Sequence, residues 1–227
     1  DPRLLQGFKS GQWQAKQLHA RHVARTFDLH DDGPLFAVVS RLVHQKGIDL
    51  TLAAAEHIVA GGGRIALICQ GERALEQQVE ALSTRFPGRV GVNLTFCETE
   101  ARRIIAGSDF LLMPSRYEPC GLSQSYAQCY GSLPIARRTG GLADTIEDGV
   151  TGFLFREATL DSYLQAIGRA LNVHRRPLLL NAMRRKAMAA PLYWHQAVQP
   201  YDRLYRRLID GTDAAFSSRR RVRACAS

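Results

Sequence analysis

The middle of the chain reads Asp109-Phe-Leu-Leu-Met113 and then Pro114-Ser-Arg-Tyr-Glu-Pro-Cys-Gly-Leu-Ser-Gln-Ser-Tyr126. The first run is apolar and predicts a buried strand. The tight turn after it carries Arg116, Glu118 and Cys120, and Gly121 opens a predicted helix. Because ligands of open α/β sheets bind outside the carboxyl ends of the strands, a carboxylate in a turn at this place indicates a ligand site.

Two further segments also lead from the end of a predicted strand into a turn; we call these three strand-end turns the corners. The first predicted strand leads into Ser40-Arg-Leu-Val-His-Gln-Lys-Gly-Ile-Asp49, and a later one leads into the glycine-rich turn Arg137-Arg-Thr-Gly-Gly-Leu-Ala-Asp144. In the first of these, Arg41 follows the strand and Lys46 precedes Gly47, where a helix is predicted to begin. A helix N-terminus offers free N–H groups and partial positive charge, and the added arginine and lysine suit a diphosphate. Solvated surface charge is the alternative interpretation of this pair.

Short apolar runs alternate with helix-length segments along the rest of the chain. We expect strands at residues 35–39, 64–69, 90–96, 109–113, 133–136 and 152–155, and helices at residues 10–27, 47–59, 74–85, 99–106, 121–130, 160–173, 177–190 and 194–209. This alternation predicts the α/β class, with a Rossmann-like, doubly wound parallel sheet flanked by helices. Leu18, Val23 and Phe27 are candidate core residues of the first helix, and Pro200 should kink the last one.

Length and composition limit the classes of protein to which the chain can belong. Its 227 residues are 45% hydrophobic, enough for one domain, which we place at residues 10–210 between a linker (1–9) and a basic, disordered tail (211–227). The net charge is +9, but the aromatic residues are not interleaved with the basic ones, so no nucleic-acid partner is expected. No apolar run has the length of a membrane span. The five cysteines form no C-x-x-C pair and the histidines lack metal-ligand spacing, so we expect no metal and a cytoplasmic location.

The three corner motifs together resemble those of the bacterial glycogen synthase and plant starch synthase family, in the same order and spacing. The resemblance extends from about Ser10 to Ile209 and covers the C-terminal, nucleotide-sugar-binding lobe of a two-lobed GT-B glycosyltransferase. It implies a retaining enzyme of family 5 that transfers glucose from ADP-glucose to the nonreducing end of an α-1,4-glucan. It further implies ADP-glucose or ADP as ligand, no metal or other cofactor, and an acceptor glucan held through an N-terminal lobe.

The resemblance assigns roles to individual residues. Arg41 and Lys46 match the diphosphate-binding pair and Glu118 matches the glutamate that contacts the sugar, so these three are the expected catalytic residues. Fixed positive charge suits the departure of a diphosphate, which is already a good leaving group. Phe96 matches an aromatic position beside the adenine. The full set expected to bind the nucleotide sugar is Arg41, Lys46, Phe96, Glu118, Cys120, Gly121, Leu122, Ser123, Thr139, Gly140, Gly141 and Leu142.

Simpler interpretations exist for several of these positions. Glu118 could cap its turn or pair with Arg116, and Phe96 is as readily a core residue as a base contact. Related transferases have a second glutamate that holds the ribose at the place where this chain has Tyr126, which leaves the ribose contact unassigned. The cysteines have structural interpretations: small size for Cys120, and burial as apolar side chains for Cys69, Cys97 and Cys129.

The family's N-terminal lobe, with its Lys-x-Gly-Gly-Leu signature, has no counterpart in the sequence. We therefore expect the chain to bind ADP or ADP-glucose weakly and to have negligible synthase activity alone, because transfer in a cleft needs both walls. Two alternatives remain open. One is a related enzyme of the sucrose or trehalose type that uses UDP-glucose, and the other is a non-catalytic nucleotide-sugar-binding module.

Overall fold

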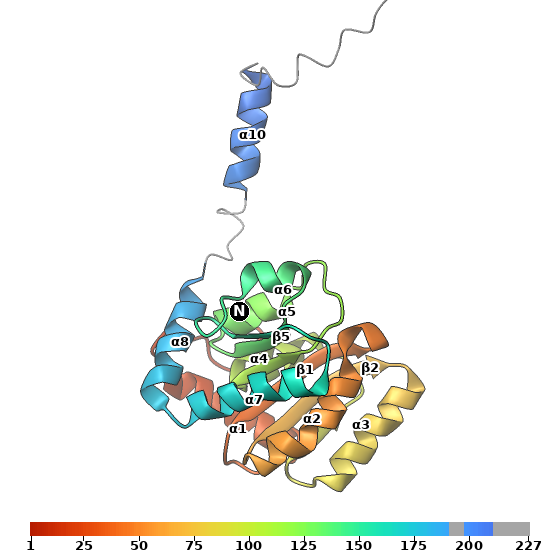
Figure 1. Cartoon of the computed structure of the whole chain (residues 1–227). Helices are drawn as coiled ribbons and strands as arrows, with labels where there is room; N and C mark the ends of the chain where they lie inside the picture. The colour runs from red at the N-terminus through yellow and green to blue at the C-terminus, as the bar shows by residue number, and fades with distance from the viewer. Residues whose placement is uncertain (191–197, 211–227) are drawn as a thin grey trace, which may run out of the picture. The chain divides into compact units, whose positions relative to one another are not determined.

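The computed structural model of the chain describes residues 1–190 and 198–210. The chain forms two compact units, Asp1–Ala190 and Pro191–Ser227 (Figure 1). Within the described part of the second unit, α10 (Gln199–Ile209) has Pro200 in its first turn, where no N–H donor is needed. The predicted kink at Pro200 depends on the preceding segment 194–197, which lies outside the described residues. The predicted tail at 211–227 and the first residues of the predicted last helix lie outside the described residues.

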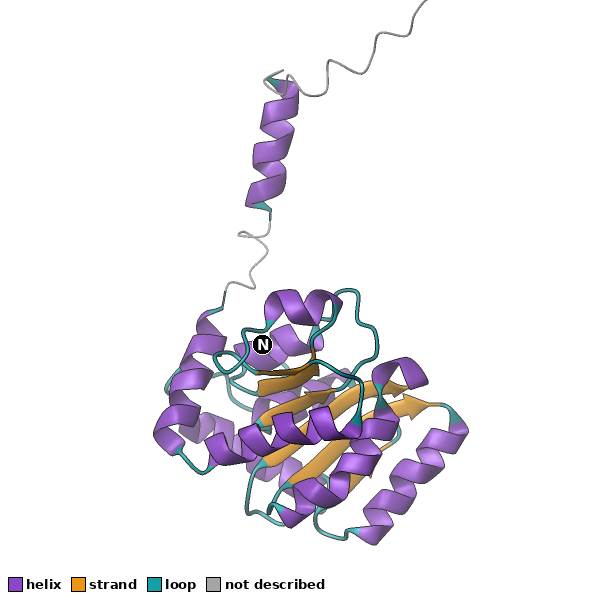
Figure 2. Ribbon diagram, in the orientation of Figure 1, coloured by secondary structure: helices purple, strands orange, loops and turns teal. Residues whose placement is uncertain are grey.

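The first unit is built on one parallel sheet of six strands (Figure 2). The strand order is β3-β2-β1-β4-β5-β6, and every neighbouring pair is parallel. This architecture confirms the predicted Rossmann-like, doubly wound α/β class. The strands are β1 (Leu35–Leu42), β2 (Arg64–Gly71), β3 (Val90–Asn93), β4 (Phe110–Met113), β5 (Leu133–Arg137) and β6 (Phe153–Phe155).

Helices cover both faces of the sheet, because parallel strands need crossover connections that return over a face. One face is covered by α2 (Ile48–Ala60), α3 (Arg73–Arg85) and α7 (Leu160–His174), and the other by α1 (Trp13–Thr26) and α4 (Glu98–Gly107) (Figure 1). The remaining helices described in this unit are the α-helices α5 (Ser123–Cys129), α6 (Gly140–Thr145) and α8 (Pro177–Ala189) and the short 3-10 turn η1 (His44–Lys46).

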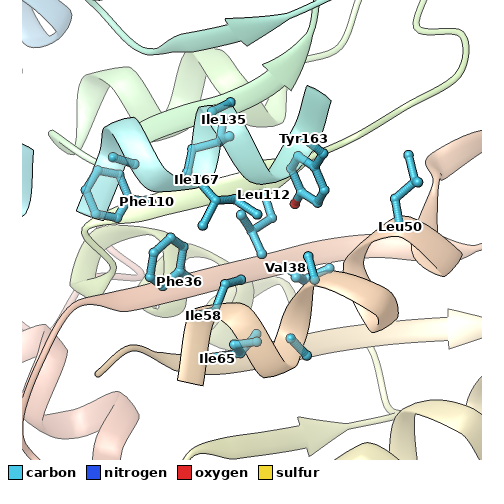
Figure 3. Close-up of a cluster of buried hydrophobic side chains, with 14 of the residues drawn as sticks. Phe36, Val38, Leu50, Ile58, Ile65, Phe110, Leu112, Ile135, Tyr163 and Ile167 are labelled. Atoms are coloured by element: carbon cyan, nitrogen blue, oxygen red, sulfur yellow. The ribbon is translucent and has the colours of Figure 1, made fainter. Parts of the chain in front are cut away.

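Alternate residues of β1 enter two separate cores. Phe36 and Val38 pack with residues of α2 and α7, among them Tyr163 (Figure 3). Leu35 and Ala37 face the other way, into the core formed with α1 and α4. Because both faces are buried, the strand reads as a continuous apolar run rather than as an alternating pattern.

Two boundaries near the predicted site differ from expectation. The strand β3 ends at Asn93, whose Oδ1 accepts a hydrogen bond of 2.8 Å from the Thr95 N–H and closes a local turn. Phe96 therefore lies in the following loop, 58% exposed, and its interpretation as a core residue is wrong. The helix α5 begins at Ser123 instead of Gly121, because Gly121 has a left-handed backbone with φ of 72°.

The burial of other predicted core residues is mixed. Val23 and Phe27 of α1 are buried as predicted, whereas Leu18 is 41% exposed, so its assignment to the core is wrong. Cys69 is buried in β2 as predicted. Cys97 is exposed instead, because β3 stops early and leaves it in the loop before α4.

The strands β1 and β4 are neighbours although β2 and β3 lie between them in the sequence. Their register consists of two pairs, Phe36 with Phe110 and Ala37 with Leu111, whereas β1 pairs with β2 from Leu35 to Leu42. The two strands therefore separate toward their carboxyl ends. This is the topological switch point of the sheet, the place where ligands of such folds bind.

Candidate functional site

A cavity of about 600 Å³ opens where β1 and β4 separate. Its volume lies in the range of small-molecule sites. Of the predicted site residues, Arg41, Lys46, Phe96 and Ser123 line it, so segments far apart in the sequence meet there. The other lining residues come mainly from the two strand ends and the segments that follow them: Val38, Val39, Ser40, Ile48, Thr51, Gln70, Leu112, Met113, Pro114 and Ser115.

Lys46 reaches the cavity from η1, the turn that follows β1. The next residue, Gly47, has φ of 66°, and a Cβ atom there would lie 2.1 Å from the Pro114 carbonyl oxygen. Only glycine permits this close approach, which packs the turn against the loop after β4. As a result, Lys46 Nζ lies 2.5 Å from Glu118 Oε2.

Glu118 is 6% exposed and is held by two donors. Its Oε2 accepts hydrogen bonds from Lys46 Nζ and from Ser115 Oγ, the latter at 3.2 Å. Within the described part of the chain, no side chain or backbone group donates to Oε1. The alternative pairing with Arg116 is wrong, because that guanidinium binds Asp49 and lowers the pKa of the Asp49 carboxyl by hydrogen bonding.

Arg41 lies exposed at the end of β1 and lines the same cavity. Its side chain makes no hydrogen bond or ion pair with any residue in 1–190 or 198–210. The cavity therefore has one cation without a counter-ion and a second, Lys46, that is paired with a buried carboxylate. Such an arrangement attracts an anion, and arginine can hold two of its oxygens at once.

The glycine-rich turn packs against the Glu118 loop. A Cβ atom on Gly140 would lie 2.1 Å from the Glu118 carbonyl oxygen, and one on Gly141 would lie 2.2 Å from the carbonyl oxygen of Cys120. The Gly141 N–H donates to the Glu118 carbonyl at 3.1 Å. The glycine-rich turn and the Glu118 loop are thus brought together. The Gly141 N–H is already bonded to a protein carbonyl instead of facing a ligand. The turn continues into α6, with Thr139 as its N-cap residue.

The remaining predicted residues stand at the edge of the cavity or away from it. Cys120 and Leu122 are exposed in the loop before α5 and, like Gly121, are not among the residues that line the cavity. Leu142 is buried in a small core with Ala136, Ile146 and Leu154, so its side chain packs rather than binds.

The described residues contain no group of three His, Cys, Asp or Glu side chains placed to hold a metal ion. No helix in residues 1–190 or 198–210 is long and apolar enough to cross a membrane. Burial raises the pKa of the Cys69 thiol to about 12, which keeps it protonated at neutral pH.

The residues from 24 to 187, which carry all three corners, match the family model described as "Glycosyl transferases group 1". The chain belongs to the group 1 glycosyl transferases. Among its relatives are glycogen synthases of Pseudomonas paraeruginosa, 63% identical over 217 residues, and of Pseudomonas aeruginosa, 62% identical over the same length. Each alignment covers 95% of this chain but 42% of the relative, so the chain spans about two fifths of these proteins' length.

Solved structures agree on the fold of this group 1 glycosyl transferase. The catalytic domain of starch synthase IV from Arabidopsis thaliana, bound to ADP and acarbose, superposes with a TM-score of 0.86 at 29% identity, covering 92% of this chain and 46% of that one. A sucrose-phosphate synthase from Thermosynechococcus elongatus gives a TM-score of 0.63 at 24% identity, over 84% of this chain and 49% of the other. The six-stranded parallel sheet is accordingly that of GT-B glycosyltransferases.

Several residues that build the site were not predicted from the sequence. Gln124 is fully buried, and its Nε2 donates to the carbonyl oxygens of Cys120 at 3.1 Å and Gly121 at 2.9 Å. Arg137 donates from Nε to the Ser115 carbonyl oxygen at 3.0 Å. Both lie inside the motifs; Gln124 binds the backbone of the loop just before its helix, and Arg137 binds the backbone of the loop after β4. A sequence pattern shows that such residues are polar and does not show what they bind.

Proposed function

We propose that this chain is the donor-binding part of a glycogen or starch synthase, which transfers glucose from ADP-glucose to the nonreducing end of an α-1,4-glucan with retention of configuration. The observation that carries the proposal is that Arg41 and Lys46 line one cavity and that Lys46 is also paired with Glu118. The 63% identity to a glycogen synthase supports it. So does the likeness to a starch synthase domain bound to ADP and acarbose.

The two cations suit the diphosphate of the donor. When glucose departs, negative charge accumulates on the diphosphate, and cations that are fixed in advance stabilise that charge. Arg41 is free to hold two phosphate oxygens. Lys46 has three N–H donors, so it can keep its bond to Glu118 while it donates to a phosphate oxygen. The chemistry of the leaving group therefore requires no metal.

Glu118 suits the sugar. Its Oε2 is occupied by Lys46 and Ser115, while Oε1 is left to accept a hydrogen bond from a glucose hydroxyl. A carboxylate beside the sugar also stabilises the positive charge of an oxocarbenium-like transition state. Phe96 supplies an exposed ring on the cavity wall, which can stack on the adenine.

Transfer to a glucan needs more than the donor site. The chain aligns with 42% of the glycogen synthases named above, and the acceptor must be held against the donor in a water-excluding cleft. We infer that an N-terminal lobe supplies the second wall and the glucan site. The chain by itself binds the nucleotide and does not extend glucan at an appreciable rate.

Calorimetric titration of the chain with ADP tests the donor site. We expect a dissociation constant on the order of 0.1–1 mM, with UDP binding more weakly and no measurable glucan extension. Absence of ADP binding at millimolar concentration contradicts the proposal. Tighter binding of UDP than of ADP favours the enzyme that uses UDP-glucose.

A chimera that adds the N-terminal part of the Pseudomonas aeruginosa glycogen synthase extends the test to catalysis. In it, Glu118→Gln should lower glucan extension by about 100-fold or more and change ADP affinity little, because the carboxylate acts on the sugar. The matched control is Glu72→Gln, which changes an exposed glutamate after β2 and should leave the rate unchanged. An unchanged rate for Glu118→Gln favours the non-catalytic module.

A further inference from the structure

Hydrogen bonds join the turn that carries Lys46 to the loop that carries Glu118. Residues other than Lys46 and Glu118 make these bonds. The guanidinium of Arg116 donates from Nη1 to Asp49 Oδ1 and from Nη2 to Asp49 Oδ2, each at 2.7 Å. Its Nη1 also donates to the carbonyl oxygen of His44 at 3.0 Å. One side chain of the Glu118 loop therefore holds both the start of the turn that carries the lysine and the first turn of α2 that follows it.

Main-chain contacts complete this clamp. The Arg116 N–H donates to the Gln45 carbonyl oxygen at 2.8 Å, and Gln45 Nε2 donates to the Tyr117 carbonyl oxygen at 2.9 Å. On the other side of the lysine, the α-carbon of Gly47 packs against the Pro114 carbonyl group. The residues before and after the lysine are both tied to the loop after β4.

The sheet itself does not supply this connection. The register between β1 and β4 ends at Ala37 and Leu111, whereas β1 continues to Leu42 and β4 to Met113. Beyond it the strands diverge around the cavity, so the distance between their loops depends on contacts outside the sheet. The Arg116 clamp connects the segments that follow β1 and β4, beyond the last residues at which these strands pair.

We propose that Arg116 is a positioning residue, whose fork on Asp49 keeps Lys46 within reach of both Glu118 and the diphosphate of the donor. The inference rests on the proposed function. Arg116 does not itself line the cavity. Its role is to set the geometry of two residues that do the binding, and a misplacement of about 1 Å is enough to weaken such a site strongly.

A matched pair elsewhere separates this role from stability. Arg89 forks onto Asp32 in the same way, at 2.9 Å and 3.0 Å, but at the opposite edge of the sheet, before β3 and β1. Hydrogen bonding to the arginine lowers the pKa of the carboxyl in both pairs. Ion pairs with this degree of exposure contribute little to global stability, so variants of either pair should fold.

Titration of the chain with ADP and with AMP tests the inference. We expect Arg116→Lys and Asp49→Asn to weaken the binding of ADP by about tenfold and that of AMP by less than about twofold. The reason is that the displaced Lys46 would contact the second phosphate, which AMP lacks. Arg116→Lys keeps the charge and loses the fork, so it distinguishes positioning from simple attraction. Arg89→Lys and Asp32→Asn should leave both affinities unchanged.

Three outcomes would overturn the inference: ADP affinity unchanged in the Arg116 and Asp49 variants, an equal loss for AMP, or the same loss in the control pair. If Arg116→Lys does not fold, Gln45→Ala removes one clamp bond outside any ion pair, and it should weaken ADP in the same direction by a smaller factor. Failure of the unmutated chain to bind ADP would be a different result, because it would contradict the proposed function.

Discussion

The strand β4 has a carboxylate just outside each of its ends, and the protein holds the two in different ways. Asp109, before the strand, accepts hydrogen bonds on both oxygens, from the Leu35 N–H at 2.8 Å and from the Arg184 guanidinium. Glu118, after the strand, has partners on Oε2 while Oε1 stays open. The saturated carboxylate joins elements of the fold, and the unsaturated one retains capacity for a ligand.

Two lysines repeat the contrast. Lys16, at the same edge as Asp109, is buried and donates to the carbonyl oxygens of Ala106 at 2.9 Å and Tyr130 at 3.0 Å. Burial lowers its pKa well below the ordinary value. Lys46, at the other edge, has one carboxylate partner and faces the cavity. Asp109 and Lys16 thus have their partners inside the protein, whereas Glu118 and Lys46 each keep bonding capacity for a ligand.

The largest effect should follow from removing the saturated carboxylate. Asp109→Ala leaves the guanidinium of Arg184, which is nearly buried, and the Leu35 N–H without their acceptor, and we expect a loss of about 3 kcal/mol in the free energy of unfolding. Glu118→Ala should cost only about 1 kcal/mol, because Lys46 lies at the cavity wall and can be hydrated. Urea denaturation of both variants measures the difference.

Equal losses from these two substitutions would break the comparison. They would mean that Glu118 is as much a part of the folding energetics as Asp109. The folded fraction of the Asp109 variant should still bind ADP with unchanged affinity, because Asp109 lies at the end of the strand away from the cavity.

The next effect concerns the ligand rather than the fold. Lys46→Met should lower the affinity for ADP by about 30-fold, since it removes a charged hydrogen-bond donor from the cavity wall. Lys16→Met removes the same chemical group at the other edge and should leave ADP affinity within about twofold. Calorimetry on the two variants checks this. Similar losses in both would show that the binding depends on overall charge rather than on the position of Lys46.

The sequence predicted the fold more accurately than it predicted where individual strands and helices begin and end. Apolar runs identified all six strands, because strands that are buried on both faces read as continuous apolar segments. The end of β3 and the start of α5 were missed for local reasons. At Asn93 a side-chain oxygen captures a backbone N–H, and at Gly121 the backbone is left-handed. Such details depend on a single hydrogen bond or dihedral angle, which periodicity does not report.

The sequence predicted which residues belong to the site, but it did not predict which of them contact one another. Arg41, Lys46 and Glu118 each follow a strand of the predicted sheet. In the structure Arg41 and Lys46 line one cavity, and Lys46 is paired with Glu118. Glu118 pairs with Lys46 rather than with Arg116, because Gly47 packs the lysine turn against the loop after β4 while Arg116 binds Asp49. Packing of two segments that are distant in sequence is a property of the assembled fold, so no local pattern contains it.

The smallest predicted effect is a pH dependence of the free energy of unfolding, and it arises at the edge of the sheet where Asp109 lies. His19 is fully buried, its Nε2 lies 3.0 Å from the Gln6 carbonyl oxygen, and burial lowers its pKa from the ordinary 6.5. The folded protein thus keeps this ring neutral at pH values where the unfolded chain binds a proton. Stability should be fully present above about pH 6.5 and should fall as the pH decreases from there toward the folded-state pKa.

Unfolding free energies at pH 7.5 and pH 5.5 measure this effect, and His19→Gln should reduce the difference between them. Part of the difference should remain, because burial also lowers the pKa of His174, which lies near Asp109 but on the opposite face of the sheet. His44→Gln is the matched control, because this histidine is exposed in the turn that carries Lys46. If His44→Gln flattened the profile and His19→Gln did not, the acid sensitivity would lie at the ligand-binding edge, and the division of the sheet into a saturated and an open edge would be wrong.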